Sequence, residues 1–393
     1  MEKTMVVSAA RTAMGRAKKG SLADVRPEDM GAAVILEALK RAGDLDPKLV
    51  DDCIIGCAMP EAEQGMNLAR EAWFRAKLPN SVSCMTINRF CASGLEAIAL
   101  GAFRIMSGMA EIVVAGGIES MSLIPMGGNK IVPHPEMAEE FYPAYVGMGE
   151  TAEIVAKRYN ITREEQDALG LRSNLLAVEG IDKGVFKEQI VPVQAYRYKP
   201  TGGKEFFQFD TDEGPRRDTS IEALSKLKPA FWKEGTVTAG NSSQMTDGAA
   251  AVVLMSKDKA KDLGLKPLGR FKGYMTVGCG PDEMGIGPSL AVPKLLAKVD
   301  LKLKEIDAIE MNEAFASQSV YCVKKLGLEG FLESRKLNPY GGAIALGHPL
   351  GATGAILSTK ILYHMRDNDL KYGIVTMCVG GGMGAAGLFE HKD

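Results

Sequence analysis

Cys91 is the first residue whose type and setting could do chemistry. It lies in the stretch NRFCASG, between an arginine–phenylalanine pair and a small Ala-Ser-Gly step. The apolar residues that follow recur at helical spacing, which predicts a buried helix that begins just after Cys91. A thiol at the amino terminus of a helix feels the positive end of the helix dipole, so we expect a lowered pKa and a larger thiolate fraction. The alternative is a cysteine that only packs, which is the commoner state of a free thiol.

His348 is the candidate base. The stretch GGAIALGHPLGATG flanks it with glycines and places a proline after it. Glycines let main chain and ligand approach closely, so this backbone is unsuited to simple packing. The other histidines, His134, His364 and His391, have ordinary surface or helix-end positions. We therefore expect Cys91 and His348 to form a nucleophilic pair.

Cys378 precedes the glycine-rich segment VGGGMG, at the end of what we expect to be the last strand of the chain. A dinucleotide-binding loop is not favoured there, because no acidic residue follows about 20 positions later. Flexible glycines would instead expose main-chain N–H groups and offer an oxyanion hole. A thiol at this point could exchange protons at small cost with a substrate that is itself a thiol.

The elements that must position these residues occur twice in the same order. The first series consists of a strand near 4–12, a helix at 27–43, a strand at 50–59, the helix after Cys91 and a strand at 110–121. A matching series starts at residue 268. Cys91 lies 37 positions after Ile54, and His348 lies 39 positions after Ile309. The pattern predicts two similar α/β units with mostly parallel, covered sheets, whose corresponding elements meet at a shared site.

A long insertion separates the two halves. We predict an amino-terminal half of residues 1–118 plus 251–267, an inserted loop subdomain of 119–250 that binds substrate, and a carboxy-terminal half of 268–393. Within the insertion we expect a helix from about 149 to 159 and a second one capped by Thr162, with Glu165 three positions later. A segment of this length with its own helices is typical of a subdomain over the site.

Composition and charge exclude several other classes. The seven cysteines are odd in number and scattered, which argues against a disulfide framework. Cys53 and Cys57 have no histidine nearby and no second pair to complete a zinc site, so we expect core residues and no metal. The net charge of −2 gives no attraction for nucleic acid. No signal peptide or apolar run of about 18 residues is present, which favours a cytoplasmic protein without a membrane partner.

Six segments together resemble the successive signatures of the thiolase family, in family order and over nearly the whole chain. They are INRFCASGLEAI, AGGIESMS, GTVTAGNSSQMTDGAAAV, MNEAFA, NPYGGAIALGHPLGATGA and MCVGGGMGAAG. Among thiolases, the chain is most similar to the bacterial 3-ketoacyl-CoA thiolases of fatty-acid β-oxidation. The resemblance implies duplicated α/β halves that form a five-layered αβαβα core.

The resemblance also implies roles at the catalytic centre. Cys91 matches the nucleophile that takes up the acyl group, and His348 the group that activates it. Cys378 matches the second catalytic cysteine, which protonates the departing carbanion in cleavage or removes the α-proton of acetyl-CoA in synthesis. Asn312 matches the residue that holds a water, which forms one oxyanion hole with His348. The N–H groups of Cys91 and Gly380 match the other hole.

Coenzyme A and acyl-CoA are implied as substrates, with no tightly bound cofactor. The resemblance implies that several residues bind these substrates. Ser243 matches a contact to the pantetheine part of coenzyme A, and Arg216 a contact to its nucleotide part. The remaining matches are Met148, Phe231 and Phe315 in the acyl tunnel and Ala239 elsewhere in the binding site. Arg217, Lys226 and Lys228 lie near Arg216 in sequence and could add to a phosphate anchor. By resemblance we expect a homodimer or homotetramer, and a β-oxidation partner enzyme is left open.

The implied reaction is thiolytic cleavage of a 3-ketoacyl-CoA through a cysteine thioester. An acetoacetyl-CoA thiolase working in the condensation direction is the alternative. Such enzymes typically carry Asn-Ala-Ser-Gly and His-Met-Gly motifs, where this chain has Asn-Ser-Ser-Gln at 241–244 and Gly-Met-Gly at 147–149. These departures favour the degradative type. Tyr340 replaces the family's usual Asn, and we expect its ring to narrow or reshape the acyl tunnel.

Two functions from other classes compete with this interpretation. A decarboxylating ketoacyl synthase shares the fold and the nucleophile, but it uses histidines where thiolases use the second cysteine, and Cys378 speaks against it. An inactive lipid- or CoA-binding homologue would be expected to lose Cys91, His348 or Cys378. All three are present.

Overall fold

A computed structural model describes residues 3–391 and contains one ten-stranded sheet built from two matching parts. In the amino-terminal part the strand order is β4-β3-β5-β8-β1, and in the carboxy-terminal part it is β10-β11-β12-β9. The strands are β1 (Thr4–Arg11), β2 (Gly15–Arg16), β3 (Asp52–Gly56), β4 (Ser83–Ile87), β5 (Ile112–Ser120), β8 (Thr246–Ser256), β9 (Gly269–Gly278), β10 (Ala308–Met311), β11 (Tyr372–Val379) and β12 (Met383–Glu390).

The two parts have the same topology, which confirms the repeat predicted from the sequence. β3 is parallel to both β4 and β5, and β10 is parallel to β11. The carboxy-terminal part has no full strand that corresponds to β4 among the described residues. At the equivalent position, Leu337 forms a single parallel bridge to Ile309 in β10. Within the sheet of residues 3–391, the two parts meet where β1 pairs with β9 over three residues, Thr4 to Val6.

The expectation of mostly parallel sheets is wrong. β8 is antiparallel to β1 and β5, and β12 is antiparallel to β11 and β9. β12 follows β11 through a turn at Gly380–Gly382, and a connection this short can join only antiparallel strands. Cys378 consequently lies near the end of β11, the strand before the last one, and not on the last strand as predicted.

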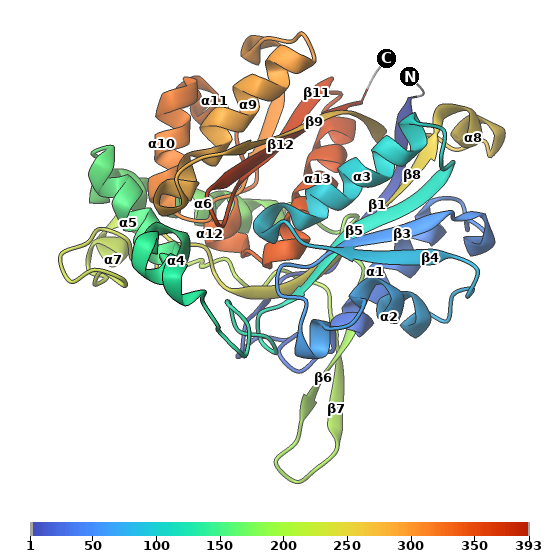
Figure 1. The fold of residues 1–393 in the computed structure, drawn as a ribbon, viewed down its shortest axis with the longest axis horizontal. Helices are drawn as coiled ribbons and strands as arrows, with labels where there is room; N and C mark the ends of the chain where they lie inside the picture. The colour runs from blue at the N-terminus through green and yellow to red at the C-terminus, as the bar shows by residue number, and fades with distance from the viewer. Residues whose placement is uncertain (1–2, 392–393) are drawn as a thin grey trace.

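Helices lie on both outer faces of the two sheet parts and between them, so the chain forms the predicted five layers (Figure 1). α3 (Ser93–Met106) and α13 (Leu350–Asp367) form the middle layer and pack against strands of both parts. α1 (Pro27–Arg41) and α2 (Leu68–Arg75) cover one outer face. α9 (Gly287–Lys298), α10 (Ala316–Leu326) and α11 (Glu329–Glu333) lie over the other.

Close helix packing in the middle layer fixes where the site residues meet. A Cβ added to Gly94 of α3 would lie 2.7 Å from the Ala355 nitrogen of α13, and one on Gly354 would lie 2.3 Å from the Leu95 nitrogen. Only glycine permits this approach of two backbones. The amino-terminal ends of both helices are thereby held side by side, with Cys91 just before one and His348 just before the other.

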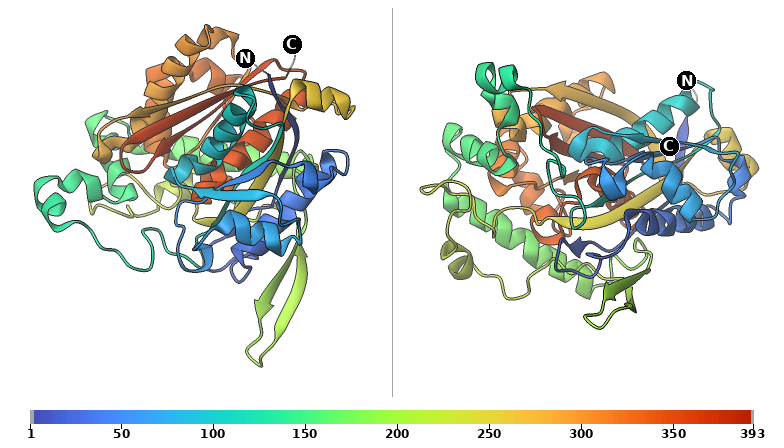
Figure 2. Two further views of the ribbon diagram at one scale, coloured as in Figure 1. Left: turned by 45° about the vertical axis from the view of Figure 1, so that its right-hand side comes forward. Right: turned by 60° about the horizontal axis from the view of Figure 1, so that its bottom comes forward.

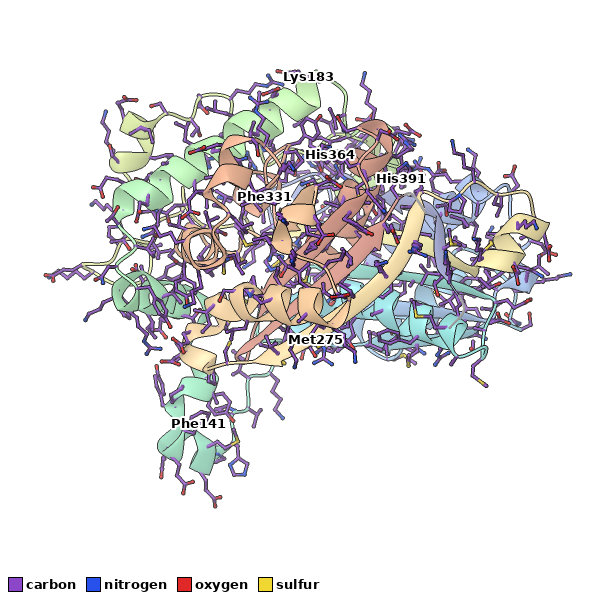
Figure 3. The ribbon with its side chains drawn as sticks, turned by 90° about the horizontal axis from the view of Figure 1, so that it is seen from above. Phe141, Lys183, Met275, Phe331, His364 and His391 are labelled. Atoms are coloured by element: carbon purple, nitrogen blue, oxygen red, sulfur yellow. The ribbon has the colours of Figure 1, made fainter. Side chains whose placement is uncertain are left out.

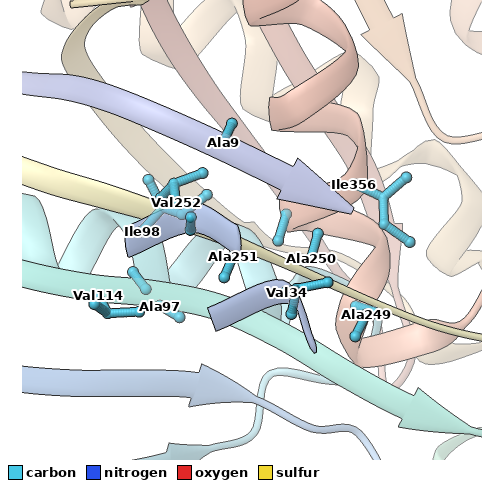
Figure 4. Close-up of a cluster of buried hydrophobic side chains, with 14 of the residues drawn as sticks. Ala9, Val34, Ala97, Ile98, Val114, Ala249, Ala250, Ala251, Val252 and Ile356 are labelled. Carbon is cyan, nitrogen blue, oxygen red and sulfur yellow. The ribbon is translucent and has the colours of Figure 1, made fainter. Parts of the chain in front are cut away.

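The largest core lies between these helices and the amino-terminal strands (Figure 4). It combines almost fully buried side chains from three adjacent layers, including Val34 of α1, Val252 of β8, and Ile98 and Ile356 of the middle helices α3 and α13. The strand β8 is buried along its whole length. Its continuous apolar sequence reflects cover on both faces.

The insertion carries short helices, a long helix and a projecting hairpin. Its elements are α4 (Pro135–Glu140), α5 (Met148–Arg158), α6 (Arg163–Asp182), β6 (Val193–Tyr198), β7 (Lys204–Phe209) and α7 (Ile221–Ser225). A short helix outside the insertion, α8 (Lys257–Asp262), follows β8. The predicted helix near 149–159 is α5, and the predicted capping box of Thr162 and Glu165 starts α6. The hairpin extends away from the layers in both views of Figure 2. The domain division stays a prediction, and β5 and β8 extend across its boundaries.

Two further searches of residues 3–391 bear on function. No helix in this range is both long and apolar enough to cross a membrane. Within the same range, no group of three or more His, Cys, Asp or Glu side chains is placed to hold a metal ion. Cys53 and Cys57 are fully buried core residues, as predicted.

Candidate active site

Cys91 lies in a 3₁₀ turn, Phe90–Ala92, that leads directly into α3. Phe90 has a φ of 42°, in the left-handed region that a bulky residue rarely adopts, so the backbone is strained just before the nucleophile. The Cys91 side chain is 7% exposed. The backbone N–H groups of Gly380 and of Cys91 itself both donate toward its sulfur. These are the two N–H groups that the resemblance places in one oxyanion hole.

The predicted lowering of the Cys91 pKa is wrong for the ligand-free protein. Burial raises the pKa of this thiol to about 11, and the two N–H donors only partly oppose that effect. The loss of water around a thiolate outweighs the favourable helix end. Cys91 is therefore a neutral thiol at pH 7 and requires a base to become a nucleophile.

His348 has the properties of that base. Its ring is buried, and burial lowers its pKa to about 4, so the imidazole is neutral at pH 7. Nδ1 lies 2.6 Å from Thr353 Oγ1, and Nε2 lies 3.3 Å from Asn312 Nδ2. This arrangement fits the tautomer in which Nδ1 donates to Thr353 and Nε2 is left as an acceptor. His348 can then take a proton on Nε2.

The backbone fixes the position of His348 on both sides. Gly347 has a φ of 111°, and a Cβ there would lie 2.3 Å from the Thr246 side chain. The His348 N–H donates to the Gln244 carbonyl at 3.0 Å. The glycine is required because no other residue fits both the conformation and the space.

Cys378 is fully buried and lies near Cys91. Burial raises its pKa well above the usual value, and the next cause is the nearby Cys91 thiol. Around it pack Met148, Phe315 and Met284 among other apolar groups. Cys91 is more than 250 residues of sequence away from His348 and Cys378, yet the three groups belong to one buried site in which each is uncharged at rest.

The predicted acyl-tunnel residues converge beside these thiols. The rings of Phe231 and Phe315 meet edge to face, with centroids 6.0 Å apart. Phe231 lies directly over Gly149, where a Cβ would be 2.1 Å from a ring carbon. A Cβ on Gly380 would lie 3.6 Å from Met148 Sδ, which places this methionine at the oxyanion turn.

The segment that carries Ala239 and Ser243 pairs with the loop of Asn312. Ser243 N–H donates to the Ala314 carbonyl at 2.9 Å, and Ser242 forms a β-bridge with Phe315. Ser243 is half-buried and Ala239 is exposed beside it. The structure therefore places both residues at the rim of the site.

The basic residues predicted to hold phosphates lie on the surface. Arg216 is exposed, and its backbone N–H donates to Asn174 Oδ1 at 2.9 Å. Arg217 makes a two-pronged ion pair with Asp182, so its charge is already engaged. Lys226 and Lys228 are exposed at the end of α7.

The expectation that Tyr340 shapes the acyl tunnel is wrong. Its ring packs edge to face against Phe186 at 6.3 Å and against His364 at 5.7 Å. His364 lies near the far end of α13, about 21 Å along the helix from Leu350 at a rise of 1.5 Å per residue. Figure 3 labels His364 at that end. Tyr340 contributes to the packing of α6 on α13, away from Phe231 and Phe315.

Three site residues were not identified from the sequence. Thr353 orients His348, Gln318 contacts Cys378, and Glu119 joins the two halves. The Glu119 carboxylate accepts hydrogen bonds from the N–H groups of Ala58 and Gly351. Only Thr353 had a usable signal, because it follows His348 by five residues on the first turns of a helix.

Thr353→Val is expected to lower kcat by about tenfold while leaving the KM for the acyl-CoA unchanged. The substitution keeps the shape but leaves Nδ1–H of the buried His348 without its acceptor, so the ring loses its fixed tautomer and orientation. Steady-state kinetics check this result. Thr359→Val is the matched control, since Thr359 is a buried threonine of the same helix that bonds only the Ala355 carbonyl. Equal losses in both variants would contradict the role of Thr353.

Comparisons with known proteins agree with this geometry. The family model described as "Thiolase, N-terminal domain" matches residues 4–258, and "Thiolase, C-terminal domain" matches residues 265–391. The chain is 49% identical to a 3-ketoacyl-CoA thiolase of Bacillus subtilis, over 99% of this chain and all of that protein. It is 42% identical to a 3-ketoacyl-CoA thiolase of Escherichia coli over the full length of both.

A solved structure shows the same fold. The crystal structure of the Bacillus anthracis acetyl-CoA acetyltransferase superposes with a TM-score of 0.89 at 39% sequence identity, over 100% of this chain and 99% of that one. Both family models together span nearly all of the described residues. The chain therefore belongs to the thiolase family.

Proposed function

We propose that this thiolase cleaves 3-ketoacyl-CoA with coenzyme A, giving acetyl-CoA and an acyl-CoA two carbons shorter. The observation that carries the proposal is the placement of the Cys91 sulfur between two N–H donors, beside a second buried thiol, in a site with a neutral histidine. The two relatives named 3-ketoacyl-CoA thiolase, at 49% and 42% identity, support the same reaction.

In the first half of the reaction, His348 Nε2 takes the proton of Cys91 and the thiolate attacks the 3-keto carbon. The oxygen of that carbon accepts from the N–H groups of Cys91 and Gly380, which already point at the sulfur. Fixed donors of this kind are worth roughly 2.7–4 kcal/mol each in comparable sites. The bond between the α and β carbons then breaks, and Cys378 gives its proton to the departing acetyl-CoA enolate.

The enolate oxygen requires donors of its own. His348 Nε2 carries the proton from Cys91 at this stage and can donate it as a hydrogen bond. Asn312 Oδ1 is buried and finds no protein partner among residues 3–391, which suits an oxygen that accepts from a water. A water held there would be the second donor to the enolate oxygen.

In the second half, the thiol of a new coenzyme A attacks the acyl thioester on Cys91. The Cys378 thiolate takes the proton of this thiol, and burial, which raises the pKa of Cys378, favours the transfer. Cys91 leaves as a thiolate and recovers its proton from His348. One thioester is exchanged for another, which makes transfer through a cysteine nearly isoenergetic.

A comparison of substrates tests this function. The thiolysis rates of acetoacetyl-CoA and of a long-chain 3-ketoacyl-CoA are measured side by side with the same enzyme. We expect both to be cleaved, with the long chain held along Met148, Phe231 and Phe315. Turnover of acetoacetyl-CoA alone would favour the second candidate, an acetyl-CoA acetyltransferase, which the name of the Bacillus anthracis structure supports.

Arg216→Ala is expected to raise the KM for coenzyme A about fivefold, with little change in kcat. Arg216 is an exposed cation, and its proposed ion pair with the phosphates of the coenzyme would be screened as salt rises. Kinetics at low and high salt measure the effect. Arg217→Ala serves as the control, because Arg217 already pairs with Asp182. A KM that responds to neither the substitution nor salt would refute the anchor.

A homo-oligomer and a cytoplasmic location stay predictions. Within residues 3–391, β4 forms a ladder with β3 alone, so its other edge has no strand partner. Beside that edge, Met85, Leu100 and Phe103 line a surface groove. An open edge next to apolar side chains is typical of a surface that another chain covers, and this supports the oligomer.

A further inference from the structure

Gln318 lies on the first turn of α10 and is almost fully buried beside Cys378. Its Oε1 atom accepts the N–H of Ala314 at 3.0 Å and, more weakly, the N–H of Phe315 at 3.5 Å. The Cys378 sulfur lies 3.7 Å from the same oxygen and donates its S–H to it. One oxygen therefore joins the loop that follows Asn312 to the second catalytic thiol.

The orientation of this amide is fixed by its backbone contacts. Only an oxygen can accept from the Ala314 N–H, so Oε1 must face this side, where Cys378 also lies. Nε2 points the other way, is buried and has no hydrogen-bond partner among the described residues. Cys378 thus faces an acceptor and not a donor. An acceptor stabilises the protonated thiol and disfavours the thiolate.

Burial and the neighbouring thiols also favour the protonated form of Cys378, and the backbone N–H of Cys378 itself opposes them only in part. Burial has the largest effect on its pKa and raises it. The titrating groups that influence it are the thiols of Cys91 before α3, Cys322 on α10 and Cys279 after β9. The remaining neighbours in the cluster, such as Met284 and Val237, are apolar. Gln318 is therefore the polar side chain that contacts the sulfur of Cys378 directly.

We propose that Gln318 is a positioning residue for Cys378, whose carbonyl oxygen holds the thiol proton and so keeps Cys378 in the acid form with which cleavage begins. The proposal rests on the proposed function, in which Cys378 protonates the acetyl-CoA enolate. The simpler alternative is that Gln318 only caps α10, since its oxygen also accepts the N–H groups of Ala314 and Phe315. The two roles differ in their effect on proton affinity.

Alkylation of Cys378 by iodoacetamide, followed over a range of pH, separates these roles. The measurement is made in the full chain with Cys91→Ser, and mass spectrometry quantifies the Cys378 peptide apart from those of Cys279 and Cys322. Gln318→Met keeps the size of the side chain but removes the acceptor. We expect it to move the midpoint of the alkylation profile to lower pH by about one unit, a tenfold change in proton affinity.

A control on the same helix turn isolates the contact. Ser317 is buried, and its hydroxyl donates to the Ala152 carbonyl at 2.9 Å without touching Cys378. Ser317→Ala loses a buried hydrogen bond of α10 and is expected to leave the midpoint where it is. A shift of equal size in this variant would show that general loosening of α10 is responsible, and it would overturn the proposal.

Gln318→Glu gives an opposite expectation and covers the case in which Gln318→Met fails to fold. A carboxylate keeps an acceptor for Ala314 and adds negative charge near the sulfur, so the alkylation midpoint should move to higher pH. An unmoved midpoint, or a shift to lower pH in Gln318→Glu, would overturn the proposal even if turnover fell.

Turnover supplies a separate readout. With Cys91 intact, Gln318→Met should accept an acetyl group from acetyl-CoA as the unmodified enzyme does, while kcat for thiolysis falls about tenfold. A kcat that stays unchanged despite a shifted midpoint would show that the contact sets proton affinity without serving cleavage, and this outcome would also refute the proposal. If the unmodified enzyme itself fails to acylate Cys91, the proposed function fails, and the alkylation profile still measures the effect of Gln318.

Discussion

Cys378→Ala is expected to be acylated on Cys91 by acetyl-CoA nearly as fast as the unmodified enzyme, yet to lose about 10³-fold or more of its thiolysis rate. Acylation uses Cys91, His348 and the two N–H donors, none of which the substitution removes. Breaking or forming the carbon–carbon bond requires a proton at the α carbon, and Cys378 is the group placed to give or take it. The residue is buried, so water does not readily replace its proton.

Two measurements on the same preparation check this result. Intact-protein mass after incubation with acetyl-CoA reports the acyl-enzyme, and thiolysis of acetoacetyl-CoA reports bond cleavage. Cys322→Ser is the matched control, because Cys322 is a buried cysteine close to Cys378 whose sulfur bonds backbone groups, the Gly285 carbonyl and the Ser289 N–H. We expect the control to retain turnover. Full turnover in Cys378→Ala would overturn the assignment of the proton donor.

The sequence predicted those parts of the fold that depend on local pattern. The buried helix after Cys91, the helix after His348 and the capping box of Thr162 and Glu165 all follow from spacing within a few turns, and the structure contains each of them. The repeat was visible because both halves keep the same order of elements. That order also placed Cys91 and His348 at corresponding points.

Strand direction and electrostatics depended on contacts that no local pattern shows. β8 returns from the insertion antiparallel to β5, which an alternation of strands and helices does not indicate. The pKa of Cys91 depends on burial by residues such as Leu350, more than 250 positions away. Tyr340 departs from the family pattern, but its ring contacts Phe186 and His364, and no local pattern predicts these neighbours.

The resting state of the site is uncharged, and this has a consequence for reactivity. Burial raises the pKa of Cys91 to about 11 and lowers that of His348 to about 4, so the empty site favours the neutral pair over the thiolate and imidazolium. Bound substrate changes this balance, because the new oxyanion receives the N–H groups of Cys91 and Gly380. Iodoacetamide, which brings no oxyanion, should therefore label Cys91 slowly at pH 7 and faster as pH rises.

Cys91→Ser is expected to lower thiolysis by about 10³-fold or more, although the side chain keeps its size and its two N–H donors. A hydroxyl is a far weaker acid than a thiol, so the proton transfer to His348 becomes still more unfavourable. An acyl group that does reach the hydroxyl forms an oxygen ester, and its return to coenzyme A must convert that ester into a less stable thioester. Slow acylation and a persistent acyl-enzyme should therefore occur together.

Intact-protein mass before and after addition of coenzyme A distinguishes the two effects, alongside steady-state thiolysis. Cys84→Ser is the control, because Cys84 is a half-buried cysteine of β4 that bonds Arg70 and lies outside the site. The control should turn over normally, while the acyl group on the substituted hydroxyl should remain after coenzyme A is added. Rapid transfer of the acyl group from the serine hydroxyl to coenzyme A would contradict this explanation, because the site would then not need a thioester at position 91.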